Sequence, residues 1–370
     1  MKIGLIDVDG RNFPNLPLMK ISAWHKSRGD AVEWYMPLLS GHMDKVYISK
    51  VFSFTPDYQY PIDADEVIRA GSGYCIEVSD GKEIYHTEKD LLLPYEIEHI
   101  YPDYSLYPEF TKDTAYGFMT RGCPNGCEFC HVGCKEGRKS HKVADLSEFW
   151  HGQKYIELMD PNTLACPDWK DILQQLIDSK AYVNFNQGVD IRLMTKEKAE
   201  MIRKIKVKSI HFAWDRYEDK EIILPKLREF KEITGWGDSK MTVYVLVNFD
   251  TTIEQDLERI YTLRDMGYSP YVMIYNKEKT KSKDTVRKMQ RWVNAKWAFK
   301  AVSRFEDYKS GGGKTCLEKI LLQRVCSTRG RLRRNTKGIL YCSGFREGKK
   351  YKRISNPYIV FSEKMNSKTM

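Results

Sequence analysis

Short apolar runs alternate with amphipathic segments in the N-terminal third of the chain. Each run is five to seven residues long and reads as a buried strand, and the segment after the first run has helical apolar spacing. The predicted strands are residues 2–8, 31–35 and 45–51, and the predicted helix is residues 16–26. This alternation predicts an α/β domain with a parallel, Rossmann-like sheet.

The segment that follows is interpreted as a connector. Residues 56–112 are rich in Tyr, Pro and Asp, and the pattern of residues 62–68 does not distinguish a strand from a helix. The first domain, with part of this connector, is assigned to residues 1–100.

The alternation resumes near residue 115 and continues to about residue 275. Six apolar runs have strand length, and amphipathic segments with helical spacing separate most of them. The predicted strands are residues 115–120, 155–159, 182–186, 209–213, 242–248 and 271–275, and the predicted helices are residues 168–179, 196–204, 222–234 and 253–266. A second α/β domain of six strand–helix units is therefore assigned to residues 101–300.

A helical extension is predicted over residues 286–308. Its rings Trp292, Trp297 and Phe299 lie among Lys and Arg residues. We expect these rings to pack the helix onto the second domain, although aromatic and basic side chains together also bind nucleic acid.

The net charge of +10 is concentrated at the C-terminus. Residues 311–370 carry 15 Lys and Arg against 3 Asp and Glu, whereas the first 310 residues carry 45 against 47. The arginines of this region cluster at Arg329, Arg331, Arg333 and Arg334. A basic C-terminal extension, residues 301–370, can neutralise the phosphates of RNA or DNA, or can act as a solubilising tail.

The cysteines and the apolar runs indicate a cellular compartment. No run approaches the roughly 20 residues needed to cross a bilayer, and no signal-peptide pattern is found. Nine cysteines then indicate reduced thiols in a cytoplasmic protein, so a disulfide-bonded loop is not expected.

Three of these cysteines carry the chemistry. Cys123, Cys127 and Cys130 form a C-x3-C-x2-C string directly after a predicted strand, among glycine and proline residues that let the backbone turn tightly. Three thiolates can hold three irons of a [4Fe–4S] cluster and leave the fourth iron open for chemistry.

A zinc site is the alternative metal centre. His131 or Cys134 can supply a fourth ligand, but zinc sites usually pair two short ligand motifs and no second pair is found. We interpret Cys134 as a free thiol. Three further cysteines are widely spaced, namely Cys316, Cys326 and Cys342. Their spacing leaves open whether they form an auxiliary metal site.

The cysteine string, with Phe129 before its last cysteine, resembles that of the radical S-adenosylmethionine (SAM) enzymes. The flanking residues, from Pro102 to Gly137, resemble the subgroup with a cobalamin-binding-like N-terminal domain. The resemblance covers roughly residues 1–300 and is sharpest at residues 100–140. It implies a partial (β/α)6 TIM-like barrel whose active site lies at the carboxyl ends of the strands.

The resemblance also implies cofactors and partners. In that family the open iron of the cluster binds the amino and carboxylate groups of SAM, and one electron then produces a 5′-deoxyadenosyl radical. An electron donor such as flavodoxin or ferredoxin is implied, and the substrate is unknown. Cobalamin is not expected, because the histidine string of cobalamin domains is missing and no histidine precedes His25. A cobalamin-dependent methyltransferase and a non-enzymatic, zinc-bearing nucleic-acid-binding protein are the alternatives.

The same resemblance suggests cofactor-binding residues. Phe129 is expected beside the adenine, and Asp160 and Asn162 are expected near the SAM amino group, where their oxygens can accept hydrogen bonds. A structural Asp-Pro turn is the alternative for Asp160.

Polar residues after the next strands complete the candidate site. Asn186 and Gln187 can bind ribose hydroxyls or substrate, as can Asp215 and Asn248. Arg192 can take the SAM carboxylate in a two-pronged contact. Asp190 and Arg192 can instead pair with each other.

Overall fold

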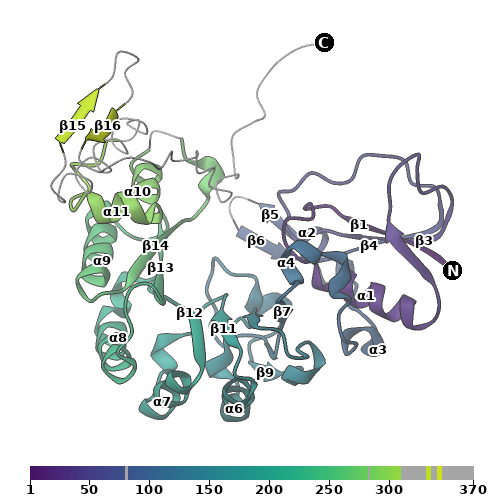
Figure 1. The fold of residues 1–370 in the computed structure, drawn as a ribbon, viewed down its shortest axis with the longest axis horizontal. Helices are drawn as coiled ribbons and strands as arrows, with labels where there is room; N and C mark the ends of the chain where they lie inside the picture. The colour runs from purple at the N-terminus through teal and green to yellow at the C-terminus, as the bar shows by residue number, and fades with distance from the viewer. Residues whose placement is uncertain (80–81, 282–283, 310–330, 335–339, 344–370) are drawn as a thin grey trace. The chain divides into compact units, whose positions relative to one another are not determined.

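A computed structural model describes residues 1–79, 82–281, 284–309, 331–334 and 340–343. They belong to two compact units, Met1–Tyr308 and Lys309–Met370, which are described separately. The first unit is a mixed α/β structure with two parallel sheets, as the sequence predicts (Figure 1).

Four parallel strands in the order β2-β1-β3-β4 form the first sheet. They are β1 (Lys2–Asp7), β2 (Ala31–Trp34), β3 (Met43–Ser49) and β4 (Ala64–Ala70). Helix α1 (Leu16–Ser27) packs against β1 through Leu18 and Ile21, and the Asn15 side chain caps it by accepting from the Leu18 amide. The three predicted strands and the helix are confirmed to within two residues.

The segment interpreted as a connector is more structured than predicted. It contains β4, which completes the first sheet. It also holds the antiparallel pair β5 (Ile76–Ser79) and β6 (Lys82–Tyr85) and the short helices α2 (Ser72–Cys75), α3 (Tyr95–Glu98) and α4 (Pro108–Thr111). The pattern did not reveal β4 because it is an edge strand whose charged residues Asp65, Glu66 and Arg69 interrupt any apolar run.

The second sheet has six parallel strands in the order β14-β13-β12-β11-β10-β7, which reverses their order along the chain. They are β7 (Thr114–Gly117), β10 (Tyr155–Leu158), β11 (Tyr182–Phe185), β12 (Lys206–Ala213), β13 (Met241–Val247) and β14 (Ser269–Ile274). All six predicted strands are found. The run over residues 115–120 divides, however, because Thr120–Arg121 (β8) leaves the sheet and pairs antiparallel with β9 (His141–Lys142).

The helices that follow these strands lie on one face of the second sheet (Figure 1). They are α6 (Trp169–Ser179), α7 (Lys196–Lys204), α8 (Lys220–Thr234) and α9 (Ile253–Asp265). Strand residues that face them, such as Val183 and Phe212, are fully buried in the main hydrophobic core. The opposite face carries half-buried polar and aromatic side chains such as His211 and Tyr244.

Helices α10 (Thr285–Asn294) and α11 (Lys296–Ala301) close the β14 edge of the second sheet. The Asn294 side chain donates to the Val272 carbonyl at 3.0 Å and accepts from the Val272 amide at 2.8 Å, as a further strand would. Trp292 and Phe299 are buried in the main core, which confirms the predicted packing for these two rings, whereas Trp297 is largely exposed.

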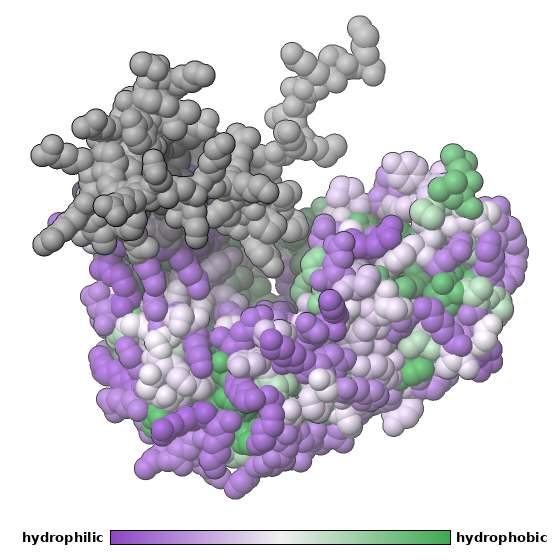
Figure 2. All heavy atoms as spheres, viewed as in Figure 1, coloured by the Kyte–Doolittle hydropathy of each residue, from purple (hydrophilic) through white to green (hydrophobic). Residues whose placement is uncertain are grey.

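The surface of the first unit seen in Figure 2 is mainly hydrophilic, with hydrophobic residues in small separate groups. In the described part of the chain, no helix combines the length and the apolar character that a membrane span requires.

In the second unit, the described residues form the antiparallel pair β15 (Arg331–Arg334) and β16 (Leu340–Ser343). Arg329, Cys316 and Cys326 lie outside the described residues. The predictions for the basic extension therefore stay predictions.

Candidate functional site

The three cysteines lie on one loop between β8 and the short helix α5 (Val132–Lys135). Gly122 begins this loop with φ +77°, and a β-carbon there would lie only 2.3 Å from the Lys139 carbonyl oxygen. Glu136 fastens the base of the loop by accepting from the Arg121 guanidinium at 2.9 Å and from the Gly122 amide at 3.1 Å. These contacts hold the loop at its base.

The cysteine side chains differ in their surroundings. Cys123 and Cys127 are half-buried and line a cavity, whereas Cys130 is exposed. Burial raises the pKa of the Cys127 thiol, and the nearby Asp215 and Cys123 raise it further. Among the described residues, no three His, Cys, Asp or Glu side chains are already arranged to hold a metal ion.

The cavity beside the cysteines lies past the carboxyl ends of β10, β11 and β12. It has a volume of about 140 Å³. Its polar lining residues are Cys123, Asn125, Cys127, Asn162, Gln187, Asp190, Arg192, Asp215, Arg216 and Asp219. This cavity, called the cysteine cavity below, contains five of the residues predicted from sequence to bind cofactor through polar groups, namely Asn162, Gln187, Asp190, Arg192 and Asp215.

Asp160 does not line the cysteine cavity. Its side chain is buried and accepts from the Met119 amide at 2.7 Å and from the hydroxyls of Thr120 and Thr163 at 2.8 and 3.2 Å. Burial raises the pKa of this carboxyl to about 6. These contacts favour a structural role, in which Asp160 ties the loop after β10 to the residues that precede the cysteines.

Asn162 lies between Asp160 and the cysteines. Its side-chain amide donates to the Cys123 sulfur at 3.5 Å, and its Oδ1 atom is buried without a hydrogen-bond partner among the described residues. A buried acceptor without a donor lowers the stability of the folded state. The Asn162 Oδ1 atom can therefore accept a hydrogen bond from a ligand.

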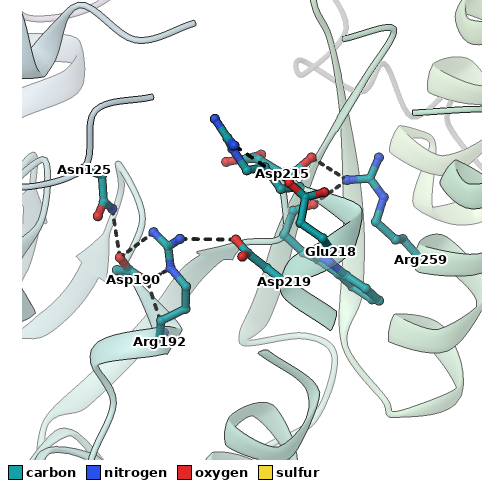
Figure 3. Close-up of polar contacts among 9 residues, drawn as sticks. Asn125, Asp190, Arg192, Asp215, Glu218, Asp219 and Arg259 are labelled. Carbon is teal, nitrogen blue, oxygen red and sulfur yellow. Dashed lines mark hydrogen bonds and ion pairs between the residues drawn. The ribbon is translucent and has the colours of Figure 1, made fainter. Parts of the chain in front are cut away.

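Asp190 and Arg192 pair with each other, which is one of the two alternatives predicted. The Arg192 Nε and one terminal nitrogen each donate to an Asp190 oxygen at 2.9 Å. Arg192 also donates to Asp219 at 3.2 Å, and Asn125 of the cysteine loop donates to Asp190 at 2.9 Å. Figure 3 shows these four residues linked in a row across the cavity.

Asp215 follows β12 and faces Cys127. Burial raises the pKa of the Asp215 carboxyl to about 6. The fully buried Arg259 of α9 fixes this turn by donating to the carbonyl oxygens of Trp214 at 2.6 Å and Asp215 at 2.9 Å (Figure 3). It also donates to the Leu246 carbonyl at 2.7 Å, so it joins the ends of β12 and β13.

Of the other predicted residues, Phe129, Asn186 and Asn248, only Phe129 lines the cavity. Phe129 lines the cavity and packs edge-on against Phe249, with ring centroids 5.4 Å apart. Asn186 does not line the cavity, and its carbonyl accepts from the Tyr244 hydroxyl at 3.3 Å. Asn248 is also absent from the lining and donates to the Tyr275 carbonyl at 2.9 Å, with φ +66°. The structure therefore does not bring Asn186 and Asn248 together with the cysteines.

Three polar lining residues were not predicted. Asn125 stands within the cysteine string, Arg216 directly follows Asp215, and Asp219 directly precedes α8. Adjacency to a predicted residue could have indicated Arg216. Nothing in the pattern could have paired Asn125 with Asp190, because that contact joins residues 65 positions apart.

Comparison with known proteins found no protein-family model and no curated protein that matches the chain.

Proposed function

We propose that the protein is a radical SAM enzyme that holds a [4Fe–4S] cluster on Cys123, Cys127 and Cys130. The observation that carries the proposal is the position of the cysteine loop. Its first two thiols face a charged cavity at the carboxyl ends of a parallel sheet, where α/β enzymes place their active sites. We infer that the six strand–helix units form a partial (β/α)6 barrel and that the first sheet belongs to a Rossmann-like domain.

The residues present fit such a cofactor in their chemistry. Three soft thiolates on one loop suit iron, and the partnerless Oδ1 atom of Asn162 lies beside Cys123. When bound and reduced, the cluster would supply the electron that cleaves SAM. The cavity of about 140 Å³ is smaller than the roughly 300 Å³ at the lower end of small-molecule sites. We therefore expect the loop and the Arg192 side chain to move outward on binding.

The cavity offers groups for both charged ends of SAM. Arg216 lines it and makes only a loose, exposed ion pair of 3.8 Å with Glu218, so its guanidinium is available for the SAM carboxylate. Arg192 is less available because Asp190 already binds it at two points. The oxygens of Asn162 and Asp215 suit the ammonium group, and Phe129 can pack against the adenine.

The alternatives gain no support from the described residues. His131 pairs with Glu83 at 2.7 Å, and the Cys134 thiol donates to the His131 carbonyl at 3.0 Å, so neither is directed at the cysteine loop as a zinc ligand. His25 is buried and bonded through both ring nitrogens to Asp30 and Tyr47, which leaves it no free nitrogen for cobalt.

The test is SAM cleavage by anaerobically reconstituted protein. With dithionite and SAM, the protein should form 5′-deoxyadenosine, measured by liquid chromatography and mass spectrometry. Arg216→Gln should weaken SAM binding at least about tenfold while iron content is kept, because a bidentate charge-assisted contact is lost. Arg203→Gln, on the exposed surface of α7, is the matched control. Absence of 5′-deoxyadenosine from iron-replete protein would refute the proposal.

A further inference from the structure

Two further cavities lie along the second sheet and its helices, and one of them borders the cysteine cavity. Gln187 lines both the cysteine cavity and a cavity of about 510 Å³ over β12, β13 and β14, called the aromatic cavity below. Ser269 and Lys296 line both the aromatic cavity and a third cavity of about 450 Å³, called the basic cavity. The aromatic cavity thus borders both of the others through shared lining residues, and the three together are called the groove below.

The aromatic cavity has a wall of flat rings. His211 and Tyr244 stack almost in parallel, with ring centroids 5.3 Å apart and an interplanar angle of 8°. Tyr271 stands edge-on to Tyr244 at 5.7 Å, and 42% of its surface is exposed. These three rings line the cavity, and an aromatic lining favours another planar ring.

His211 adds a directional polar group to this wall. Its Nδ1 atom lies 2.7 Å from the Phe185 carbonyl oxygen, which only accepts, so Nδ1 carries the proton. Burial lowers the pKa of the His211 imidazole, and the Lys296 charge lowers it further. In the neutral ring with its proton on Nδ1, the Nε2 atom is an acceptor. The amide of Gln187 at the cavity rim can both donate and accept.

The basic cavity supplies positive charge at the other end of the groove. Its cations are Lys231, Arg264, Lys296 and Lys300, and Asp238 is its carboxylate. Lys300 pairs with Asp238 at 2.8 Å, and Arg264 pairs with Asp265 at 3.3 Å. The exposed Lys296 ammonium has neither an ion pair nor a hydrogen bond with any described residue.

We propose that this groove binds a nucleotide unit of the substrate, with the base against the His211 and Tyr244 rings and the phosphate at Lys296. A flat wall with an acceptor, followed by cations, matches a base followed by a phosphate. The groove then leads past Gln187 to the cysteines, which places the bound unit next to the reacting cavity. The role of the groove as a substrate site rests on the proposed function, whereas nucleotide binding by the groove does not.

The experiment is a titration of the full-length protein, without SAM, by isothermal calorimetry at low salt. The probes are AMP, GMP, CMP and UMP with their matched nucleosides, followed by ten-nucleotide single strands of DNA and RNA. At least one monophosphate should bind about tenfold more tightly than its matched nucleoside, or one strand about tenfold more tightly than the nucleosides, because phosphate contacts are electrostatic. A preference for free monophosphates or for strands distinguishes a small-molecule substrate from a nucleotide within a polymer.

Two variants at exposed positions locate the binding. Lys296→Gln should reduce monophosphate affinity to that of the nucleoside. Tyr271→Ala should weaken nucleoside and monophosphate alike by about tenfold, because it removes part of the aromatic wall. Lys170→Gln, an exposed lysine on α6, is the control and should change nothing. Circular dichroism confirms folding of each variant.

The outcomes are separable from those of the proposed function. Cys123→Ala should bind nucleotides like the wild type, since the groove needs no iron. No binding of any probe, or binding unchanged in both Lys296→Gln and Tyr271→Ala, overturns the groove even if 5′-deoxyadenosine forms. Nucleotide binding that both variants reduce supports the groove even if the protein holds no iron.

Discussion

Asp160 and Asp215, each after a strand of the second sheet, have different surroundings. Asp160 bonds to three groups of the protein itself, whereas Asp215 lines the cysteine cavity beside Cys127. Position after a strand therefore indicates a place at the sheet edge but not which way the side chain turns. The direction is decided by nearby donors, which the sequence pattern does not show.

Replacement of Asp160 tests its structural role. Asp160→Ala would leave the buried Met119 amide and two hydroxyls without their acceptor, so we expect a loss of about 2–4 kcal/mol in the free energy of unfolding. Urea denaturation measures this loss. The exposed Asp178→Ala on α6 should stay within about 0.5 kcal/mol of the wild type. A stable Asp160→Ala protein with weakened SAM binding would instead restore the predicted cofactor contact.

The sequence could predict the cysteines, but not the partners of the cavity residues. The C-x3-C-x2-C spacing is local, so it can be recognised without a structure. Contacts such as that of Asn125 with Asp190 are non-local and depend on how the loop folds over the sheet. Arg259 was missed for the same reason, because a buried arginine on a helix has no sequence signal until the carbonyls that it bonds are known.

At the scale of elements, α5 is too short to be stable alone, and its neighbours hold it in place. Lys135 at its end donates to Asp90 at 2.6 Å, and Tyr85 of β6 donates to the same carboxylate at 3.0 Å. Burial alone would raise the pKa of Asp90, but the contacts with Lys135 and Tyr85 bring it below its usual value. The segment around β5 and β6 therefore supports the helix that follows Cys130.

Breaking this ion pair should be costly. Lys135→Met leaves the nearly buried Asp90 carboxylate unpaired, and we expect a loss of about 2–3 kcal/mol in unfolding free energy. The double variant Asp90→Asn, Lys135→Met should recover at least half of it. Lys170→Met, which breaks the exposed pair with Glu197, should cost under about 0.5 kcal/mol. Denaturant midpoints of the variants give these differences, and equal losses for both lysines would contradict the assigned role.

Elements were predictable where the apolar run was continuous. The six strands of the second sheet were found because their helix-facing residues are buried. Edge strand β4 and the pair β5 and β6 were not predicted, since charged residues interrupt the pattern of β4 and the other two strands have only four residues each.

At the scale of the first unit, a hydrogen bond joins the first sheet to the segment that leads to the second sheet. The Tyr107 hydroxyl, just before β7, donates to Asp7 at the end of β1 at 2.8 Å. Burial raises the pKa of Asp7 to about 6 from its usual value near 3.8. Between these values the folded state holds more protons than the unfolded state, so this group lowers stability as pH rises from about 4 to 6.

Asp7→Asn should remove this pH dependence. We expect the decline in unfolding free energy between pH 4 and 6 to be smaller in the variant by about 1–2 kcal/mol, allowing for partial exposure of the group. Urea denaturation at several pH values measures it. Asp178→Asn should keep the wild-type slope, and an unchanged slope in Asp7→Asn would show that Asp7 titrates normally.

The central claim is that Cys123, Cys127 and Cys130 together hold a [4Fe–4S] cluster. The most direct measurement is iron and sulfide per chain in anaerobically reconstituted protein, with Mössbauer spectroscopy to identify the cluster. The wild type and Cys134→Ala should each contain about four irons per chain, and alanine at any of the three cysteines should abolish the cluster. Stoichiometric zinc with no iron, or a cluster retained without all three thiols, would contradict the account.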